Sequence, residues 1–268
     1  MAHDGKVDEV VRRARALALR GEDEAAKQIY LEALRIDPAC FEALNDLGAL
    51  AYASGHRSAA RTAYRQAVDT HPANPIGRVN LANILAEDGD PRAAQLQFEA
   101  ALALDPDLPQ AHQGLARVLD ELGDERAERH RQIGFVGRSI EQRRYRGEGR
   151  GVPLLLLATA RLGNMPTRLW IDDGAFAISI VHVEYWRPSE TLPPHALIVN
   201  AVADADLCGA ALTRAQNLLA HSSAPVVNLP ARVAATGRAE NARRLADIPG
   251  VVTPKVETLS PLARSTKM

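Results

Sequence analysis

Hydrophobic and polar residues follow a helical period through the first half of the chain, and the pattern changes near residue 152. Before that point, apolar residues recur every three or four positions in stretches of the length of ordinary helices. After it, short apolar runs rich in β-branched residues alternate with helical stretches. We therefore expect a helical domain over residues 1–140, an Arg/Gly-rich linker over 141–151 and an α/β domain over 152–268.

The helical part contains an internal repeat of 34 residues. Five kinds of residue return at that spacing: Gly21, Gly55, Gly89 and Gly123; Ala26, Ala60 and Ala94; Tyr30, Tyr64 and Phe98; Ala33, Ala67 and Ala101; Pro38, Pro72 and Pro106. A fixed period of this length indicates a stacked array of similar units. In each unit the glycine suits a tight turn between two helices, and the first alanine lets helix backbones approach closely. The aromatic ring fills the space between units, and the proline ends the second helix.

These units resemble the tetratricopeptide repeat, a helix–turn–helix unit of this length. In the second unit the resemblance is carried by Leu47, Gly48, Gly55, Ala60, Tyr64, Ala67 and Pro72, and the third unit matches at Leu81, Ala82, Gly89, Ala94, Phe98, Ala101 and Pro106. The first unit has Arg13 and Ala14 where Leu and Gly are usual, and Glu128 replaces the small alanine in the fourth. The resemblance implies an α-solenoid of about four repeats over residues 7 to about 140, whose last repeat is a cap.

A repeat array of this kind has a concave groove lined by its first helices, which implies binding of a partner protein or peptide. The residues expected to face the groove are Arg15, Asn45, Tyr52, Asn83 and Arg117. They predict a polar groove with some positive charge. An alternative is that they are solvated groove residues without a single ligand, because a fold alone does not imply one.

An arginine-rich segment joins the two domains. Residues 126–150 contain eight arginines and three glutamates. The arginines that could hold an anionic partner are Arg126, Arg129, Arg143, Arg144, Arg146 and Arg150. We favour the other interpretation, a capping helix with a solvated face followed by a glycine-marked linker.

The sequence from residue 152 onward predicts a small parallel sheet covered by helices on both faces, because its apolar runs alternate with helical stretches. The expected strands are "VPLLLLAT", "FAISIVHVEYW", "HALIVNAVA", "APVVN" and "GVVTPKVETL". The expected helices are "DLCGAALTRAQNLLAHS" and "ARVAATGRAENARRLADI".

Polar residues follow several of these strands. Ligands of open α/β sheets sit beyond the carboxyl ends of the strands, so this edge is a candidate small-ligand site. Its residues are Asn164, Thr167, Asn200, Asp204, Asp206, Asn228 and Arg238. Asn and Asp also cap helices and form turns, and on that interpretation Asp206 is the N-cap of the helix at "LCGAAL".

Residues of about 195–260 resemble the end of the pre-ATP-grasp domain, the Rossmann-like N-terminal lobe of ATP-grasp carboxylate–amine ligases. The matching positions are Pro225, Val227, Asn228, Thr236, Arg238, Asn241, Leu245, Thr253 and Pro254. The lysines and carboxylates that would hold ATP and Mg²⁺ belong to further lobes that the sequence lacks. We therefore expect no cofactor and no catalysis by this chain alone, and keep a ligase whose other lobes are missing as the alternative.

Composition limits the remaining functions. The 268 residues are 46% hydrophobic with a net charge of −1, which argues against general affinity for nucleic acid or anionic membranes. Two distant cysteines form neither a disulfide framework nor a zinc cluster, and "MAHDGKVDEV" lacks a signal-peptide core, so the cytoplasm is expected. His182 and Glu184 would share one side of a strand, more often a structural pair than a metal site. Self-association is left open.

Overall fold

The computed structural model describes residues 2–253, 255 and 256, which divide into two units. The first unit contains the residues up to Ser139 together with Arg143–Gly151 and Asp173–Ala177. The second contains Ile140–Gln142, Val152–Asp172 and the residues from Ile178 onward.

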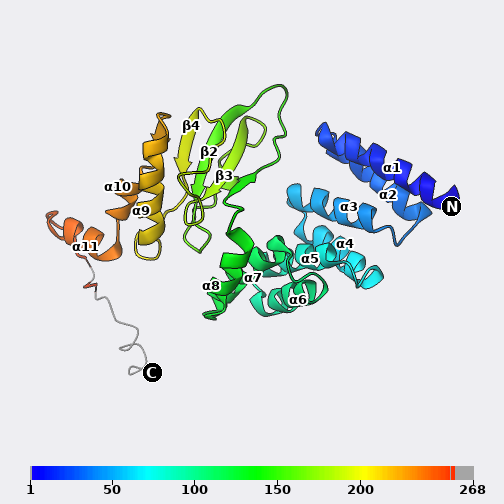
Figure 1. Cartoon of the computed structure of the whole chain (residues 1–268), viewed down its shortest axis with the longest axis horizontal. Helices are drawn as coiled ribbons and strands as arrows, with labels where there is room; N and C mark the ends of the chain where they lie inside the picture. The colour runs from blue at the N-terminus through cyan, green and yellow to red at the C-terminus, as the bar shows by residue number, and fades with distance from the viewer. Residues whose placement is uncertain (1, 254, 257–268) are drawn as a thin grey trace. The chain divides into compact units, whose positions relative to one another are not determined.

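The first unit is a series of helix pairs, in which each helix packs against the next along the chain (Figure 1). The helices are α1 (Ala2–Leu19), α2 (Asp23–Ile36), α3 (Phe41–Ala53), α4 (Arg57–Thr70), α5 (Pro75–Glu87), α6 (Pro91–Leu104), α7 (Pro109–Leu122) and α8 (Ala127–Phe135). Pro75, Pro91 and Pro109 open three of them, where the missing N–H of proline costs no helical hydrogen bond. The predicted helix–turn–helix repeats are confirmed.

The repeated glycines form the turn inside each pair. Gly21, Gly55, Gly89 and Gly123 have φ angles of 77°, 79°, 83° and 70°. This left-handed conformation costs an ordinary L-residue free energy because its Cβ approaches the following carbonyl, a cost that glycine avoids. The 34-residue spacing of glycine therefore reflects one backbone requirement met four times.

Small residues and aromatic rings are complementary between neighbouring helices. Ala60 and Ala94 are fully buried, and so is the ring of Phe98. A Cβ at Gly48 would lie 2.6 Å from the Tyr64 ring, and a Cβ at Gly114 would lie 2.2 Å from the Phe98 ring. The rings of the second helices thus occupy space that the small residues of the first helices leave open.

The second unit contains a five-stranded sheet in the order β1-β3-β2-β4-β5. The strands are β1 (Ile140–Gln142), β2 (Val152–Ala158), β3 (Phe176–His182), β4 (Leu197–Asn200) and β5 (Val226–Val227). β4 pairs in parallel with both β2 and β5, whereas β1 pairs antiparallel with β3. The sheet is therefore mixed.

The expectation of a wholly parallel sheet is wrong, because β1 pairs antiparallel with β3. β1 includes Glu141 and Gln142, which were expected in the linker, and between β2 and β3 the chain forms a 3₁₀ turn at Thr167–Leu169. β1 is three largely exposed residues paired through their backbone, so its sequence carries no apolar signature. Within "GVVTPKVETL", residues 250–253, 255 and 256 form no strand, and Pro254 and residues 257–259 lie outside the described part of the chain.

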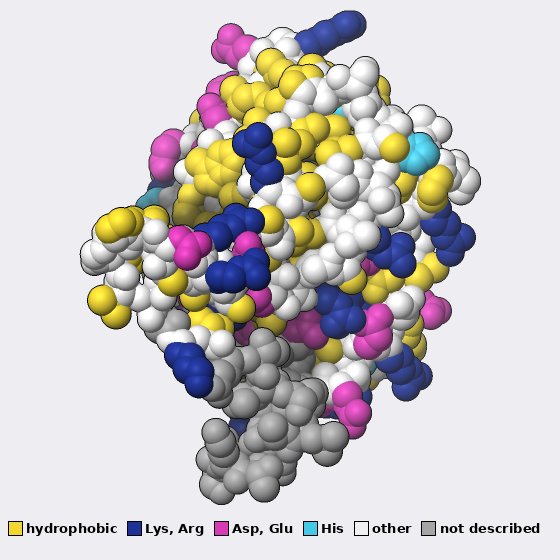
Figure 2. All heavy atoms as spheres, turned by 90° about the vertical axis from the view of Figure 1, so that its left-hand side faces the viewer, with side chains coloured by type: hydrophobic (Ala, Val, Ile, Leu, Met, Phe, Trp, Pro, Cys, Tyr) yellow, Lys and Arg dark blue, Asp and Glu magenta, His cyan; other side chains and the backbone are white. Residues whose placement is uncertain are grey.

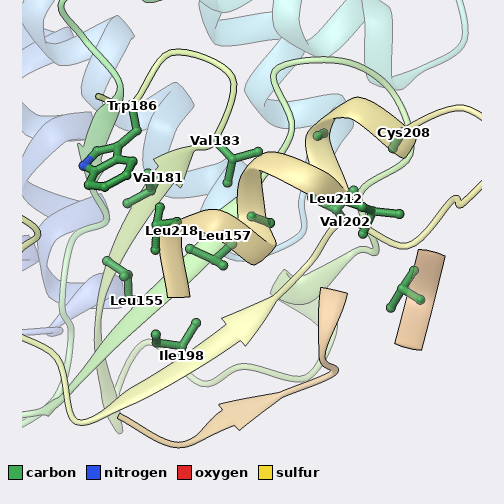
Figure 3. Close-up of a cluster of buried hydrophobic side chains, with 13 residues drawn as sticks. Leu155, Leu157, Val181, Val183, Trp186, Ile198, Val202, Cys208, Leu212 and Leu218 are labelled. Atoms are coloured by element: carbon green, nitrogen blue, oxygen red, sulfur yellow. The ribbon is translucent and has the colours of Figure 1, made fainter. Parts of the chain in front are cut away.

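The core of the second unit lies between the sheet and α9 (Gly209–Leu218). Figure 3 shows Leu155, Leu157, Val181 and Ile198 of the strands with Leu212 and Leu218 of the helix. Leu154 and Leu156, which point to the opposite face of β2, are also buried, as expected for a run that is apolar throughout. The remaining helices are η2 (Leu219–His221), α10 (Pro230–Ala234) and α11 (Arg238–Ala246).

Candidate functional site

The odd-numbered helices of the first unit carry a continuous series of polar side chains, the polar ladder. α1 packs against α3, and α5 packs against α7, so the first helices of successive pairs are neighbours. Eight side chains on these helices make up the polar ladder: Arg15, Asn45, Asp46, Tyr52, Asn80, Asn83, Glu87 and Arg117. All five residues predicted to face the groove belong to it.

Arg15 connects α1 to α3. Its Nε lies 2.5 Å from Oδ2 of Asp46, and the hydroxyl of Tyr30 donates to the same oxygen at 3.4 Å. The bond to Asp46 raises the pKa of Arg15. Burial is the largest of the effects that raise the pKa of Tyr30 to about 12, so its phenol stays protonated near neutral pH. The charge of Arg15 is therefore largely balanced at this end of the ladder.

Amides and a tyrosine connect α3 to α5. Nδ2 of Asn80 donates to Oδ1 of Asn45 at 2.7 Å, and Nδ2 of Asn45 donates to Asp46 at 3.2 Å. The Tyr52 hydroxyl donates to Oε1 of Glu87 at 2.6 Å. The ladder thus reaches the next repeat through hydrogen bonds between side chains.

Arg117 connects α7 to α5 through a hydrogen bond to a neutral side chain. Its Nη2 donates to Oδ1 of Asn83 at 3.2 Å, and within the described residues it forms no ion pair. A guanidinium group has five N–H donors in a planar fork, so one bond to a neutral amide leaves most of them available. Arg117 and Asn83 are accordingly the part of the ladder best suited to an anionic or carbonyl group.

Sequence reasoning missed Asp46, Asn80 and Glu87. Asp46 and Asn80 are one repeat period apart, so the register of the repeats was a signal that could have found them. Glu87 carries no such signal, because its role depends on the reach of Tyr52 from the neighbouring helix.

The arginines of the predicted junction are mostly engaged within the first unit. The expected helix is α8, where Arg131 is buried against Asp120. Arg126 binds Asp124, and Arg146 binds Asp173 through bonds of 3.1 Å. Arg144 donates to the carbonyl of Ala18, in the last turn of α1, where a cation is favoured by the helix dipole. Figure 2 faces the side of the molecule that carries α10 and α11, where basic side chains lie among acidic and hydrophobic ones.

Four of the seven residues predicted at the sheet edge line one hollow of about 340 Å³ in the second unit: Asn164, Asp204, Asp206 and Arg238. Nη2 of Arg238 lies 3.6 Å from Asp204 and Nη1 lies 3.5 Å from Asp206. The arginine is largely exposed, so this pairing is weak and open to competition from solvent or a ligand.

The other three residues do not line this hollow, and two of them bind the backbone at the same edge. Asn200 is fully buried and binds both backbone polar groups of Val202. Asn228 has a φ of 61° and donates to the Asn200 carbonyl at 2.9 Å. Thr167 is buried at the start of the 3₁₀ turn. Asn164, although it lines the hollow, also binds the backbone of Thr159 at 2.9 and 2.8 Å.

The assignment of Asp206 as N-cap of the following helix is wrong. α9 begins at Gly209, its N-cap is Cys208, and no side chain accepts a capping hydrogen bond there. Oδ2 of Asp206 instead accepts a hydrogen bond of 3.1 Å from the backbone N–H of Arg238. Arg238 is the first residue of α11. The carboxylate therefore satisfies a free N–H of a helix 32 residues further along the chain.

His182 and Glu184 do not pair with each other. Nε2 of His182 lies 3.8 Å from Glu141, whereas Glu184 accepts hydrogen bonds from the Thr159 hydroxyl and the Ala160 N–H. Among the described residues there is no group of three or more His, Cys, Asp and Glu side chains placed to hold a metal ion. In the same part of the chain no helix combines the length and apolarity needed to cross a membrane.

Comparison with known proteins locates the likeness in the helical region. The tetratricopeptide repeat family matches residues 11–40 and 77–108. Among solved structures, a MamA fragment from Desulfovibrio magneticus RS-1 is 22% identical, with 46% of this chain and 71% of that chain covered and a TM-score of 0.42. YrrB, described as a tetratricopeptide repeat protein with an unusual peptide-binding site, is 18% identical over 50% of this chain and 73% of its own, with a TM-score of 0.43.

The first tetratricopeptide repeat domain of Spaghetti (RPAP3), bound to an HSP90 peptide, is 14% identical over 45% of this chain and 95% of its own, with a TM-score of 0.43. No curated protein matched the chain. None of these comparisons supports the resemblance of the second unit to a pre-ATP-grasp lobe. The repeat period and the four glycine turns agree with the family match, which identifies tetratricopeptide repeats at residues 11–40 and 77–108.

Proposed function

We propose that this chain is a protein-interaction scaffold whose polar ladder binds an extended peptide segment of a partner protein. The observation that carries the proposal is the alignment of the predicted groove residues on the first helices of four successive pairs. Arg117 and Asn83 retain hydrogen-bonding capacity there, whereas Arg15 is balanced by Asp46.

The chemistry of the polar ladder fits a peptide. An extended peptide presents carbonyl groups along its length and a carboxylate at its end or on acidic side chains. Guanidinium and amide groups donate to these acceptors, and charge-assisted hydrogen bonds are about twice as strong as neutral ones. Because the repeats set one polar group beside the next along the array, several such bonds can form on one peptide.

A peptide selection on the purified chain tests this proposal. Peptides enriched from a random display library are synthesised with a fluorophore, and their dissociation constants are measured by anisotropy. We expect Arg117→Ala and Asn83→Ala each to weaken binding by about tenfold, which corresponds to about 1.4 kcal/mol. The matched control is Arg65→Ala, because Arg65 is an exposed arginine on α4, outside the polar ladder. Failure to enrich any peptide, or an equal loss in the Arg65 variant, contradicts the proposal.

The hollow at the ends of β2 and β4 is the basis of a second candidate function. Its residues lie beyond the carboxyl ends of two parallel strands, where α/β sheets bind ligands. On this alternative the second unit is the substrate-side lobe of an ATP-grasp ligase, in which ATP and Mg²⁺ bind other lobes. Calorimetry of the chain with ATP and Mg²⁺ is expected to show no binding, and tight binding would refute our assignment.

We further propose that the scaffold works in the cytoplasm and needs no cofactor. The two cysteines, Cys40 and Cys208, are both free and buried, and burial raises the pKa of each thiol. Such thiols are stable in a reducing compartment. Sedimentation of the purified chain would establish whether it self-associates.

A further inference from the structure

A serine and a histidine meet in the second unit, away from the sheet-edge hollow. Nε2 of His195 lies 2.7 Å from Oγ of Ser222. Both side chains line a hollow of about 690 Å³, formed by the segment before β4 and the segment before β5. Nothing in the repeat domain or in the polar ladder requires this arrangement.

The hydrogen bonds define the protonation of the pair. Nδ1 of His195 lies 2.7 Å from the carbonyl oxygen of Pro193, which can only accept a hydrogen bond. Nδ1 therefore carries the proton of the neutral imidazole, and Nε2 is left as an acceptor. Oγ of Ser222 accepts the backbone N–H of Ala224 at 3.1 Å, so its own proton is free to point at Nε2.

This is the arrangement of an activated nucleophile. A hydroxyl bonded to a histidine, whose other nitrogen is held by a fixed acceptor, is the combination that acyl-transfer enzymes use. A carbonyl takes the place that a carboxylate has in catalytic triads, so the imidazole is oriented but receives less help with a positive charge. The N–H of Ser223, which follows Ser222, makes no hydrogen bond within the described residues and can donate to a developing oxyanion.

The walls of the hollow suggest the substrate class. Trp186, Leu192 and Pro194 line part of the hollow, but most of its surface is polar, and Thr191 and Glu190 are among its polar residues. The ring of Trp186 packs edge-on against His221 with centroids 5.1 Å apart, which holds that side of the hollow in place. An uncharged acyl group of a few carbons matches a surface of this kind better than a phosphate, because among the residues that line the hollow there is no lysine or arginine.

We propose that Ser222 and His195 form a second, catalytic site that hydrolyses short-chain carboxylic esters. Ser222 Oγ attacks the ester carbonyl carbon while its proton passes to Nε2 of His195. The carbon–oxygen bond to the alcohol breaks, and the alcohol leaves with that proton, so that an acyl-Ser222 remains. Water then attacks the acyl carbon, gives its proton to His195, and releases the carboxylic acid as Ser222 regains a proton. Ester and water become acid and alcohol, and no other reactant is consumed.

A fluorophosphonate probe tests the nucleophile directly, since it reacts covalently with activated serines. We expect the full chain to be labelled at Ser222, identified by mass spectrometry of the modified peptide. Ser222→Ala abolishes labelling, and His195→Gln slows it by at least about 100-fold, because general base catalysis contributes that much or more. Ser58→Ala, a change in an exposed serine of α4 that has no part in the proposed site, leaves labelling at Ser222 intact.

Hydrolysis of p-nitrophenyl butyrate gives the second measurement. We expect the wild-type chain to show an initial burst of p-nitrophenol and Ser222→Ala to lose it. A rate that survives in Ser222→Ala means that a histidine attacks the ester by itself, and it overturns the proposal. So does an unlabelled wild-type chain, a result that does not depend on whether any variant folds. Thermal melting of His195→Gln shows whether its slower labelling comes from lost chemistry or from unfolding, and equal labelling in that folded variant also overturns the proposal.

Discussion

Arg131 of α8 forms a bidentate ion pair with Asp120 of α7. Nη1 lies 2.6 Å from one carboxylate oxygen and Nη2 lies 3.0 Å from the other, while Nε donates to Glu128 at 3.2 Å. The arginine side chain is only 1% exposed. The last helix pair is therefore fastened by a buried, two-pronged ion pair as well as by apolar packing.

Removing one partner of this pair should be costly. We expect Asp120→Ala to lower the free energy of unfolding by about 3–5 kcal/mol, because it leaves a buried positive charge with one remaining partner. The double variant Arg131→Met with Asp120→Leu should be clearly more stable than Asp120→Ala, because neither charge remains. Urea unfolding monitored by circular dichroism gives the comparison. A single variant as stable as the wild type would mean that the pair adds nothing to the cap.

The buried alanines of the second helices should not tolerate bulk. Ala60→Leu and Ala94→Leu are each expected to destabilise the array by about 1–3 kcal/mol, since both sites are fully buried and overpacking displaces neighbouring helices. The matched control is Ala59→Leu, because Ala59 precedes Ala60 on α4 and is exposed. Equal melting temperatures for the Ala59 and Ala60 variants would show that the helix contact is wrongly assigned.

The turn glycines should resist substitution for a different reason. Gly55 has no side-chain neighbour within 4 Å of its would-be Cβ, so Gly55→Ala meets no steric clash. We expect it to cost about 1–2 kcal/mol all the same, because a φ of 79° is unfavourable for an L-residue. Gly5→Ala in α1 should be neutral or slightly stabilising, since its site is equally open and lies within a helix. In thermal melts we expect the melting temperature of Gly55→Ala to fall and that of Gly5→Ala to stay the same or rise slightly.

Two histidines should make the last helix pair, α7 and α8, less stable at acidic pH. Nδ1 of His112 lies 2.8 Å from Nδ1 of His130, and Nε2 of His112 binds the Pro106 carbonyl at 2.8 Å. Burial is the first cause that lowers the pKa of His130, and the charges of His112, Arg129 and Arg126 lower it further, while Glu99 opposes them. The folded protein thus takes up this proton at a lower pH than the unfolded chain does.

The sign of the pH effect follows from that lowered pKa. The stability contributed at His130 is complete above the ordinary histidine pKa of about 6.5 and is lost as the pH falls through the lowered value. We expect the urea midpoint of the wild type to fall between pH 7.5 and pH 5.5 by more than that of His130→Gln. Because the other histidines remain in both proteins, the difference between the two shifts isolates His130. Identical shifts would contradict this account.

The sequence predicted the first unit more fully than the second because the two kinds of structure depend on different contacts. In the repeats each element meets only its neighbours, so one set of residues at one spacing defines turn, contact and stop. Gly21, Ala26 and Tyr30 specify the first pair in the same way as Gly55, Ala60 and Tyr64 specify the second.

In the second unit the pairing partners lie far apart in sequence. β1 joins β3 across about 40 residues and has no apolar pattern of its own. Asp206 was expected to cap the nearest helix, and it instead accepts a hydrogen bond from the backbone N–H of Arg238. The meeting of His195 and Ser222 left no motif at all, because neither residue has a sequence neighbour that indicates its partner.

By itself the sequence determined the repeat length, the paired helices and the side chains on the first helices, because these are local and periodic properties of the chain. The tertiary structure decided which polar groups are satisfied and which remain available. Arg15 is balanced by Asp46, whereas Arg117 keeps donors free, and the two arginines are indistinguishable until the helices pack. The physical reason is that a charge is neutralised by whatever folding brings within about 3 Å, and folding sets that distance through contacts spread over the whole unit.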